Sequence, residues 1–110
     1  PNPELRREAI NLLGAMRAQP ELAQMYASES NVEVREAILH GLFVSGAHDK
    51  IIELAKTEKD PKLRRQAIHH LGTMRRQESS DALAALYGTE TDPKVKRGIL
   101  HALFIQGNAP

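Results

Sequence analysis

The sequence predicts an all-α fold, an α-solenoid (superhelix) of stacked antiparallel helix pairs with about seven helices. Residues 60–72 are one copy of a segment that recurs four times, with copies starting at Asn2, Asn31, Asp60 and Asp92, spaced by 29, 29 and 32 residues. Apolar residues in each copy follow helical spacing, and no segment alternates apolar and polar residues as a strand would. A fixed period of this length is typical of stacked supersecondary units.

The first two repeats are expected to form helices over 3–17, 20–28, 32–45 and 48–57. The two longer helices begin just after an Asn, which is a good N-cap, and their apolar residues recur every three or four positions. The two shorter helices are amphipathic as well. Each repeat is therefore interpreted as a longer first helix followed by a shorter second helix.

The third and fourth repeats are expected to form helices over 61–76, 79–88 and 93–106. Asp precedes both longer helices and Pro occupies their first position, which suits a helix N-terminus. The third step is three residues longer than the others, and the extra residues fall around 78–80. We expect them to lengthen the turn before the 79–88 helix, where an insertion costs little.

Two kinds of repeat alternate along the chain. The first and third match at an offset of 58 residues, so that the Leu13-Gly14 pair reappears as Leu71-Gly72. The second and fourth match at an offset of 61 residues. This alternation indicates duplication of a two-repeat block, and the four copies predict one repeat array over 1–110. Because the first residue is Pro rather than Met, we expect the array to be part of a longer one.

Composition narrows the class of protein. The chain has 110 residues, 41% of them hydrophobic and 26% charged, which is typical of a globular domain. Its net charge of +1 gives no overall attraction to nucleic acid or membrane, and it has no Cys for disulfides or thiol chemistry. No apolar run is long enough to cross a membrane. The compartment is left open, with the cytoplasm favoured.

The segment Asp-Pro-Lys-Leu-Arg-Arg-Gln-Ala-Ile-x-x-Leu-Gly resembles the HEAT-like repeat of the phycobilisome-lyase type. The resemblance implies that the first helix of each pair lines a concave face and the second lies on the convex side. It also implies an Asp–Arg ladder that joins neighbouring repeats through charge-assisted hydrogen bonds. The ladder positions are Asn2, Asn31, Asp60 and Asp92 with Arg6, Arg35, Arg64 and Lys96.

The expected concave face carries one row of polar residues from each first helix. The row is acidic in the first half of the chain and basic in the second, which suits a partner polypeptide with charges of both signs. We predict that this face binds the partner through Glu33, Glu36, His40, Lys62, Arg65, His69, Lys94, Arg97 and His101.

Three of these residues, His40, His69 and His101, occupy the same position in successive repeats. A column of imidazoles raises the possibility of a metal site. Packed helices lie about 8–10 Å apart, and no carboxylate flanks the His69–His101 pair to complete a ligand shell. We therefore predict no metal and no cofactor. His70 is expected to lie between repeats.

Catalysis is not expected. The chain has no Cys nucleophile, no Gly-rich phosphate loop and no recognisable Ser-His-Asp arrangement. The resemblance raises bilin lyases and deoxyhypusine hydroxylase as enzymes of this architecture, but the His-Glu dipeptides that bind iron in the hydroxylase are missing here. A lyase-type accessory enzyme is the weakest alternative.

The remaining alternatives are a nucleic-acid-binding module and a protein scaffold. Basic residues gather in the second half, at Lys62, Arg64, Arg65, Arg75, Arg76, Lys94, Lys96 and Arg97. The balanced net charge and the lack of inward aromatic residues count against nucleic acid. We therefore predict a non-catalytic scaffold that binds protein or peptide and no membrane, and that can self-associate through its uncapped end repeats.

Overall fold

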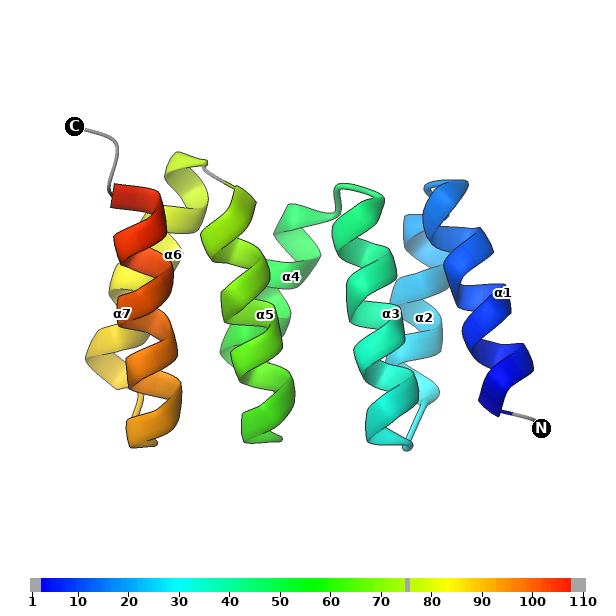
Figure 1. The fold of residues 1–110 in the computed structure, drawn as a ribbon, viewed down its shortest axis with the longest axis horizontal. Coiled ribbons are helices and arrows are strands. Elements are labelled where there is room, and N and C mark those ends of the chain that lie inside the picture. Colours follow the sequence, from blue (N-terminus) through cyan, green and yellow to red (C-terminus); the bar gives the residue numbers. More distant parts are fainter. Residues whose placement is uncertain (1–2, 75, 108–110) are drawn as a thin grey trace. The chain divides into compact units, whose positions relative to one another are not determined.

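The computed structural model describes residues 3–74 and 76–107 of the chain (Figure 1). The described residues form helices and no strand, so the predicted all-α fold class is confirmed. The helices are α1 (Pro3–Ala15), α2 (Gln19–Ser28), α3 (Val32–Val44), α4 (His48–Thr57), α5 (Pro61–Met74), α6 (Gln77–Thr89) and α7 (Pro93–Gly107).

The chain divides into two compact units, residues 1–50 and 51–110, with the boundary inside α4. In the first unit α1 and α3 pack together and α2 packs against both. In the second unit α5 and α7 pack together and α6 packs against both. In each unit, two first helices thus form one layer and a second helix lies behind them (Figure 1).

Apolar side chains fill the space inside each unit. Leu22, which the sequence places on the apolar face of a second helix, is fully buried, as is Leu83 at the equivalent place in α6. Burying a side chain of this size contributes roughly 1.5–3 kcal/mol. Other side chains no more than 1% exposed include Ile10, Val34, Ile38, Leu42, Ile68, Leu71, Val95 and Ile99.

The first helices approach each other closely where one of them carries Gly. A Cβ added at Gly14 would lie 3.1 Å from the Cα of Gly41, so α1 and α3 touch through backbone. A Cβ added at Gly72 would lie 2.9 Å from the Cβ of Ala102, at the equivalent point between α5 and α7. The recurring Leu-Gly pair therefore marks the helix–helix crossing in each unit.

The first two long helices end in the same motif. The N–H groups of Arg17 and Ala18 donate to the carbonyls of Gly14 and Leu13 at 3.1 and 2.9 Å. Arg17 has a φ of 58°, and Gly46, one period later, has a φ of 81° with the same pair of hydrogen bonds. This is the Schellman motif, whose left-handed residue is usually Gly. Helix α1 consequently ends at Ala15, two residues before its predicted end.

Arg17→Gly is expected to stabilise the chain by about 0.5–1 kcal/mol. The left-handed conformation costs a non-Gly residue roughly 1–2 kcal/mol, and Gly avoids this cost. Gly also has more conformational entropy in the unfolded chain, which stabilises the unfolded state and reduces the net gain. The urea midpoint followed by circular dichroism should rise with an unchanged slope. Gly46→Ala should lower it, and a lower midpoint for Arg17→Gly would contradict the argument.

The expected long turn before α6 is wrong. Residues 78–80 lie inside α6, which has 13 residues, whereas α2 and α4 have 10 each. The three extra residues therefore lengthen the helix rather than the turn. Ser79 is fully buried and lies in the first turn of α6, so this polar tripeptide is part of the helix and not a loop.

Candidate interaction groove

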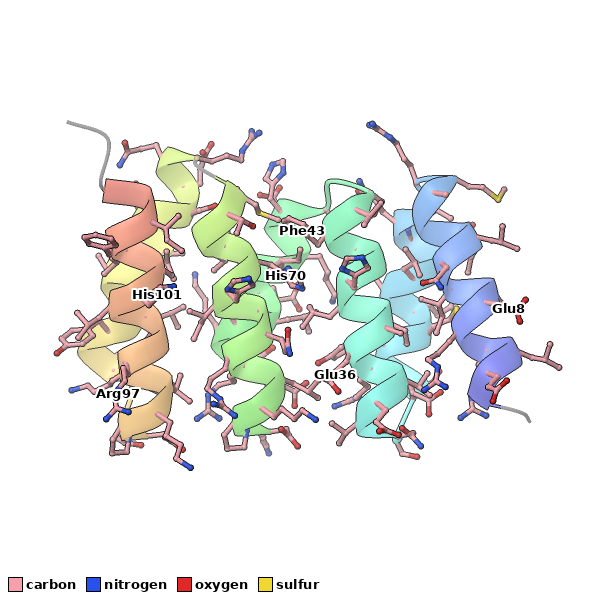
Figure 2. The ribbon with its side chains drawn as sticks, in the orientation of Figure 1. Glu8, Glu36, Phe43, His70, Arg97 and His101 are labelled. Atoms are coloured by element: carbon pink, nitrogen blue, oxygen red, sulfur yellow. The ribbon has the colours of Figure 1, made fainter. Side chains whose placement is uncertain are left out.

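The predicted site residues lie on three helices. Glu33, Glu36 and His40 belong to α3 in the first unit, and the six others belong to α5 and α7 in the second. All are exposed except Glu36, which is half-buried. Figure 2 shows Arg97 and His101 along the same side of α7. The structure thus brings six of the nine residues together in one unit, at Lys62, Arg65, His69, Lys94, Arg97 and His101.

A groove of about 530 Å³ is lined by Arg65 of α5 and by Lys94, Arg97, Gly98 and His101 of α7. Four of these five residues were predicted from the sequence. Gly98 was not, although a glycine directly after a basic residue inside a predicted helix is a readable signal. A Cβ added at Gly98 would have Arg65 Cγ as its nearest neighbour, at 4.0 Å. Gly98 therefore leaves space between the two helices.

A second hollow of about 390 Å³ adjoins α5 and is lined by Lys62, Arg65, Gln66 and His69. Arg65 lines both hollows, so they share a guanidinium group. The residues 62, 65 and 69 on α5 have the same spacing as 94, 97 and 101 on α7. This spacing of three and four residues keeps each set on one face of its helix.

The groove is positively charged. Among the described residues, no carboxylate lines either hollow. Within the described part of the chain, the side chains of Arg65, Lys94 and Arg97 make no ion pair. Unpaired cations gathered in a concave surface attract anionic groups. The acidic residues of the predicted face, Glu33 and Glu36, lie in the other unit.

Two arginines of the predicted ladder pair with Glu residues. Arg64 makes a two-pronged ion pair with Glu90, with its Nη2 and Nε at 3.0 and 3.2 Å from the carboxylate oxygens. Arg6 Nε lies 3.5 Å from Glu29. The side chain of Asp60 accepts from the backbone N–H groups of residues 62 and 63 and so caps its own helix.

Sequence reasoning missed the role of Glu29, Glu58 and Glu90. Each carboxylate accepts the backbone N–H of the residue two positions later, at 3.0 Å in all three repeats. Those later residues, at 31, 60 and 92, are the helix N-caps. A Glu two residues before each Asn or Asp cap was the available signal. Asn2, the first ladder position, lies outside the described residues.

Two basic residues of the ladder also contact aromatic rings. The Arg35 guanidinium lies 4.6 Å from the centroid of Tyr26, and the Lys96 ammonium lies 4.8 Å from the centroid of Tyr87. Such cation–π contacts contribute about 0.5–1 kcal/mol at exposed sites. The matching contacts in two alternate repeats indicate that these residues fasten a second helix to the next first helix.

Exposed apolar side chains form a different kind of surface on α1 and α7. Leu5, Leu12 and Met16 are 63%, 64% and 73% exposed on α1, and Leu100 and Phe104 are 51% and 68% exposed on α7. Their repeat equivalents Leu63 and Leu39 are buried. The α1 and α7 faces therefore have the apolar character of the repeat core but are open to solvent here.

The described residues offer neither a metal site nor a membrane span. Among residues 3–74 and 76–107, no three His, Asp or Glu side chains lie close enough to hold a metal ion. None of the helices described is both long and apolar enough to span a bilayer. His70 is buried, 8% exposed, and its ring lies 6.1 Å from that of His69.

Helix pairs repeated at a fixed period, with a cap, a helix crossing and a Glu–cap bond in equivalent places, define a helical-repeat protein. A family model described as HEAT repeats matches residues 48–109, more than half of the chain. The chain therefore belongs to the HEAT-repeat family, and the predicted resemblance is confirmed at that level. The phycobilisome-lyase type remains a prediction. No curated protein and no solved structure is significantly similar to the chain.

Proposed function

We propose that this chain is a non-catalytic scaffold that binds a partner polypeptide along the exposed polar rows of its first helices. HEAT repeats are in general protein-interaction scaffolds. The observation that favours these rows is the α5–α7 groove, which is lined by four exposed residues of the predicted site, Arg65, Lys94, Arg97 and His101. On this proposal, α3 contributes Glu33, Glu36 and His40 to the same partner-binding role.

The groove favours polypeptide over nucleic acid. Two of the eight basic residues in the second half are engaged elsewhere, Arg64 with Glu90 and Lys96 with Tyr87. Neither hollow is lined by an aromatic residue other than His, so bases would lack a stacking platform. The two rows carry four cations, Lys62, Arg65, Lys94 and Arg97. That is few for a continuous contact with phosphates.

Peptide selection tests the proposal. A random peptide library displayed on phage is selected against the immobilised chain, and the enriched peptides are added to ¹⁵N-labelled protein. We expect amide shifts concentrated in α3, α5 and α7. Shifts confined to α2, α4 and α6 would place binding on the second helices and contradict the proposal, as would the failure of any peptide to enrich.

Self-association through the α1 and α7 apolar faces is a separate proposal. The exposure of Leu5, Met16 and Phe104 supports it, since an apolar face left in water favours association. Sedimentation velocity over a range of concentrations is the measurement. Association that disappears in Met16→Glu and in Phe104→Glu would support it, and a monomer at every concentration would contradict it.

A further inference from the structure

We propose that the α5–α7 groove binds an extended acidic segment of a polypeptide, whose carboxylates pair with Arg65 and Arg97. This inference rests on the proposed scaffold function and specifies the chemistry of the partner. The groove offers cations on both sides and no carboxylate of its own. A ligand rich in Asp or Glu supplies the missing charge, and each guanidinium can bind a carboxylate through two hydrogen bonds.

The two rows define the length of the segment. The α7 row of Lys94, Arg97 and His101 lines the groove together with Arg65 of α5. The other residues of the α5 row, Lys62 and His69, line the adjoining hollow. Seven helical residues rise about 10 Å. An extended chain advances about 3.3 Å per residue, so three or four ligand residues span each row. Along the α7 row the first two positions are cationic, and His101 is the third.

Gly98 provides room for the ligand. It lines the groove between Arg97 and His101, and its missing side chain leaves only Arg65 Cγ near the position of a Cβ. A glycine at such a place permits the close approach of another backbone. The segment therefore lies over Gly98 with its side chains directed to the flanking rows.

The cations of the groove are not needed for the fold. Arg65, Lys94 and Arg97 are exposed and make no ion pair within the described residues, whereas the neighbouring Arg64 is half-buried against Glu90. Arg64 therefore has a structural role, whereas the adjacent Arg65 is available to a ligand. Uncompensated positive charge in a concave surface is a cost to the free protein that an acidic ligand removes.

Fluorescence anisotropy with defined probes tests the inference. The probe is a fluorescein-labelled eight-residue peptide of alternating Glu and Gly, and the controls are the same peptide with Gln for Glu and a single-stranded DNA of eight nucleotides. We expect the Glu peptide to bind and the Gln peptide to bind about tenfold more weakly or worse, because the charge-assisted bonds are lost. The affinity for the Glu peptide should fall as salt rises.

Two triple variants that remove the same charge from different positions test whether the Glu peptide binds in the groove. Arg65→Gln/Lys94→Gln/Arg97→Gln should weaken Glu-peptide binding about tenfold or more. A control that removes equal charge from exposed positions of the same unit should bind within about twofold of wild type, since distant exposed charges are screened. The control is Lys56→Gln/Lys59→Gln/Arg76→Gln. Gly98→Leu should also weaken binding, because it fills the groove without changing the charge.

Several results would overturn the inference. Equal losses in the two triple variants would show attraction to net charge only. Equal binding of the Gln peptide, or tighter binding of the DNA with loss in the groove variant, would exclude an acidic polypeptide as the ligand. If peptides from the library shift α5 and α7 amides but the Glu peptide does not bind, the inference fails and the scaffold function stands. If no peptide binds, both fail.

Discussion

Replacing Gly72 by Leu is expected to lower the free energy of unfolding by about 3 kcal/mol or more, because overpacking a tight helix crossing forces the backbones apart. Even the Cβ of Ala at this position would lie 2.9 Å from the Cβ of Ala102 and 3.0 Å from its Cα. Gly72→Ala should therefore cost about 1–2 kcal/mol, net of the roughly 1 kcal/mol that Ala gains over Gly in a helix. Urea unfolding followed by circular dichroism measures both.

Two variants separate packing from helix propensity. Gly88→Ala places a methyl group in the same unit where nothing lies within 4 Å, so it should stabilise the chain by up to about 1 kcal/mol. The double variant Gly72→Ala/Ala102→Gly moves the methyl group to the other helix and should recover most of the loss. If Gly72→Ala were as harmless as Gly88→Ala, the close approach of α5 and α7 would not limit stability.

The sequence predicts those features of the fold that depend on neighbouring residues, and it misses those that depend on residues far apart in the chain. The first helices begin where Asn31, Asp60 and Asp92 place a cap, because a cap bond involves only neighbouring residues. The end of α1 was missed because a left-handed Arg17 is not signalled by its residue type. The recurrence of Gly14 and Gly72 was visible, but its cause, a neighbouring backbone, becomes apparent only in three dimensions.

For the candidate site too, the sequence predicts which residues share a helix face better than it predicts the contacts between helices. Helical spacing places Arg65 with His69 and Arg97 with His101 on common faces, and both pairs are exposed as that spacing predicts. The repeat pattern predicts that these helices share one face, but it does not show how much space lies between them, so the part of Gly98 in the groove was missed. The predicted ladder singled out Arg64 as a residue that joins repeats, but it did not predict its partner, Glu90.

Arg64→Ala is expected to lower the free energy of unfolding by about 2–4 kcal/mol, because it leaves a largely buried carboxylate without its partner. The side chains of Arg64 and Glu90 are only 18% and 10% exposed. The Nη1 of Arg64 also donates to the carbonyls of Glu58 and Lys59, at 3.3 and 2.9 Å. One substitution thus removes the bonds that join the end of α4, the start of α5 and the end of α6.

The Arg6–Glu29 pair provides the comparison. Its Nε–oxygen distance is 3.5 Å and its side chains are 29% and 17% exposed, so Arg6→Ala should cost only about 1 kcal/mol. A double-mutant cycle of Arg64→Ala and Glu90→Ala should give a coupling energy of about 1–3 kcal/mol. Because Glu90 also accepts the N–H of Asp92 at 3.0 Å, Glu90→Gln should lose less than Glu90→Ala. Additive single losses at 64 and 90 would mean that the pair does not join the start of α5 to the end of α6.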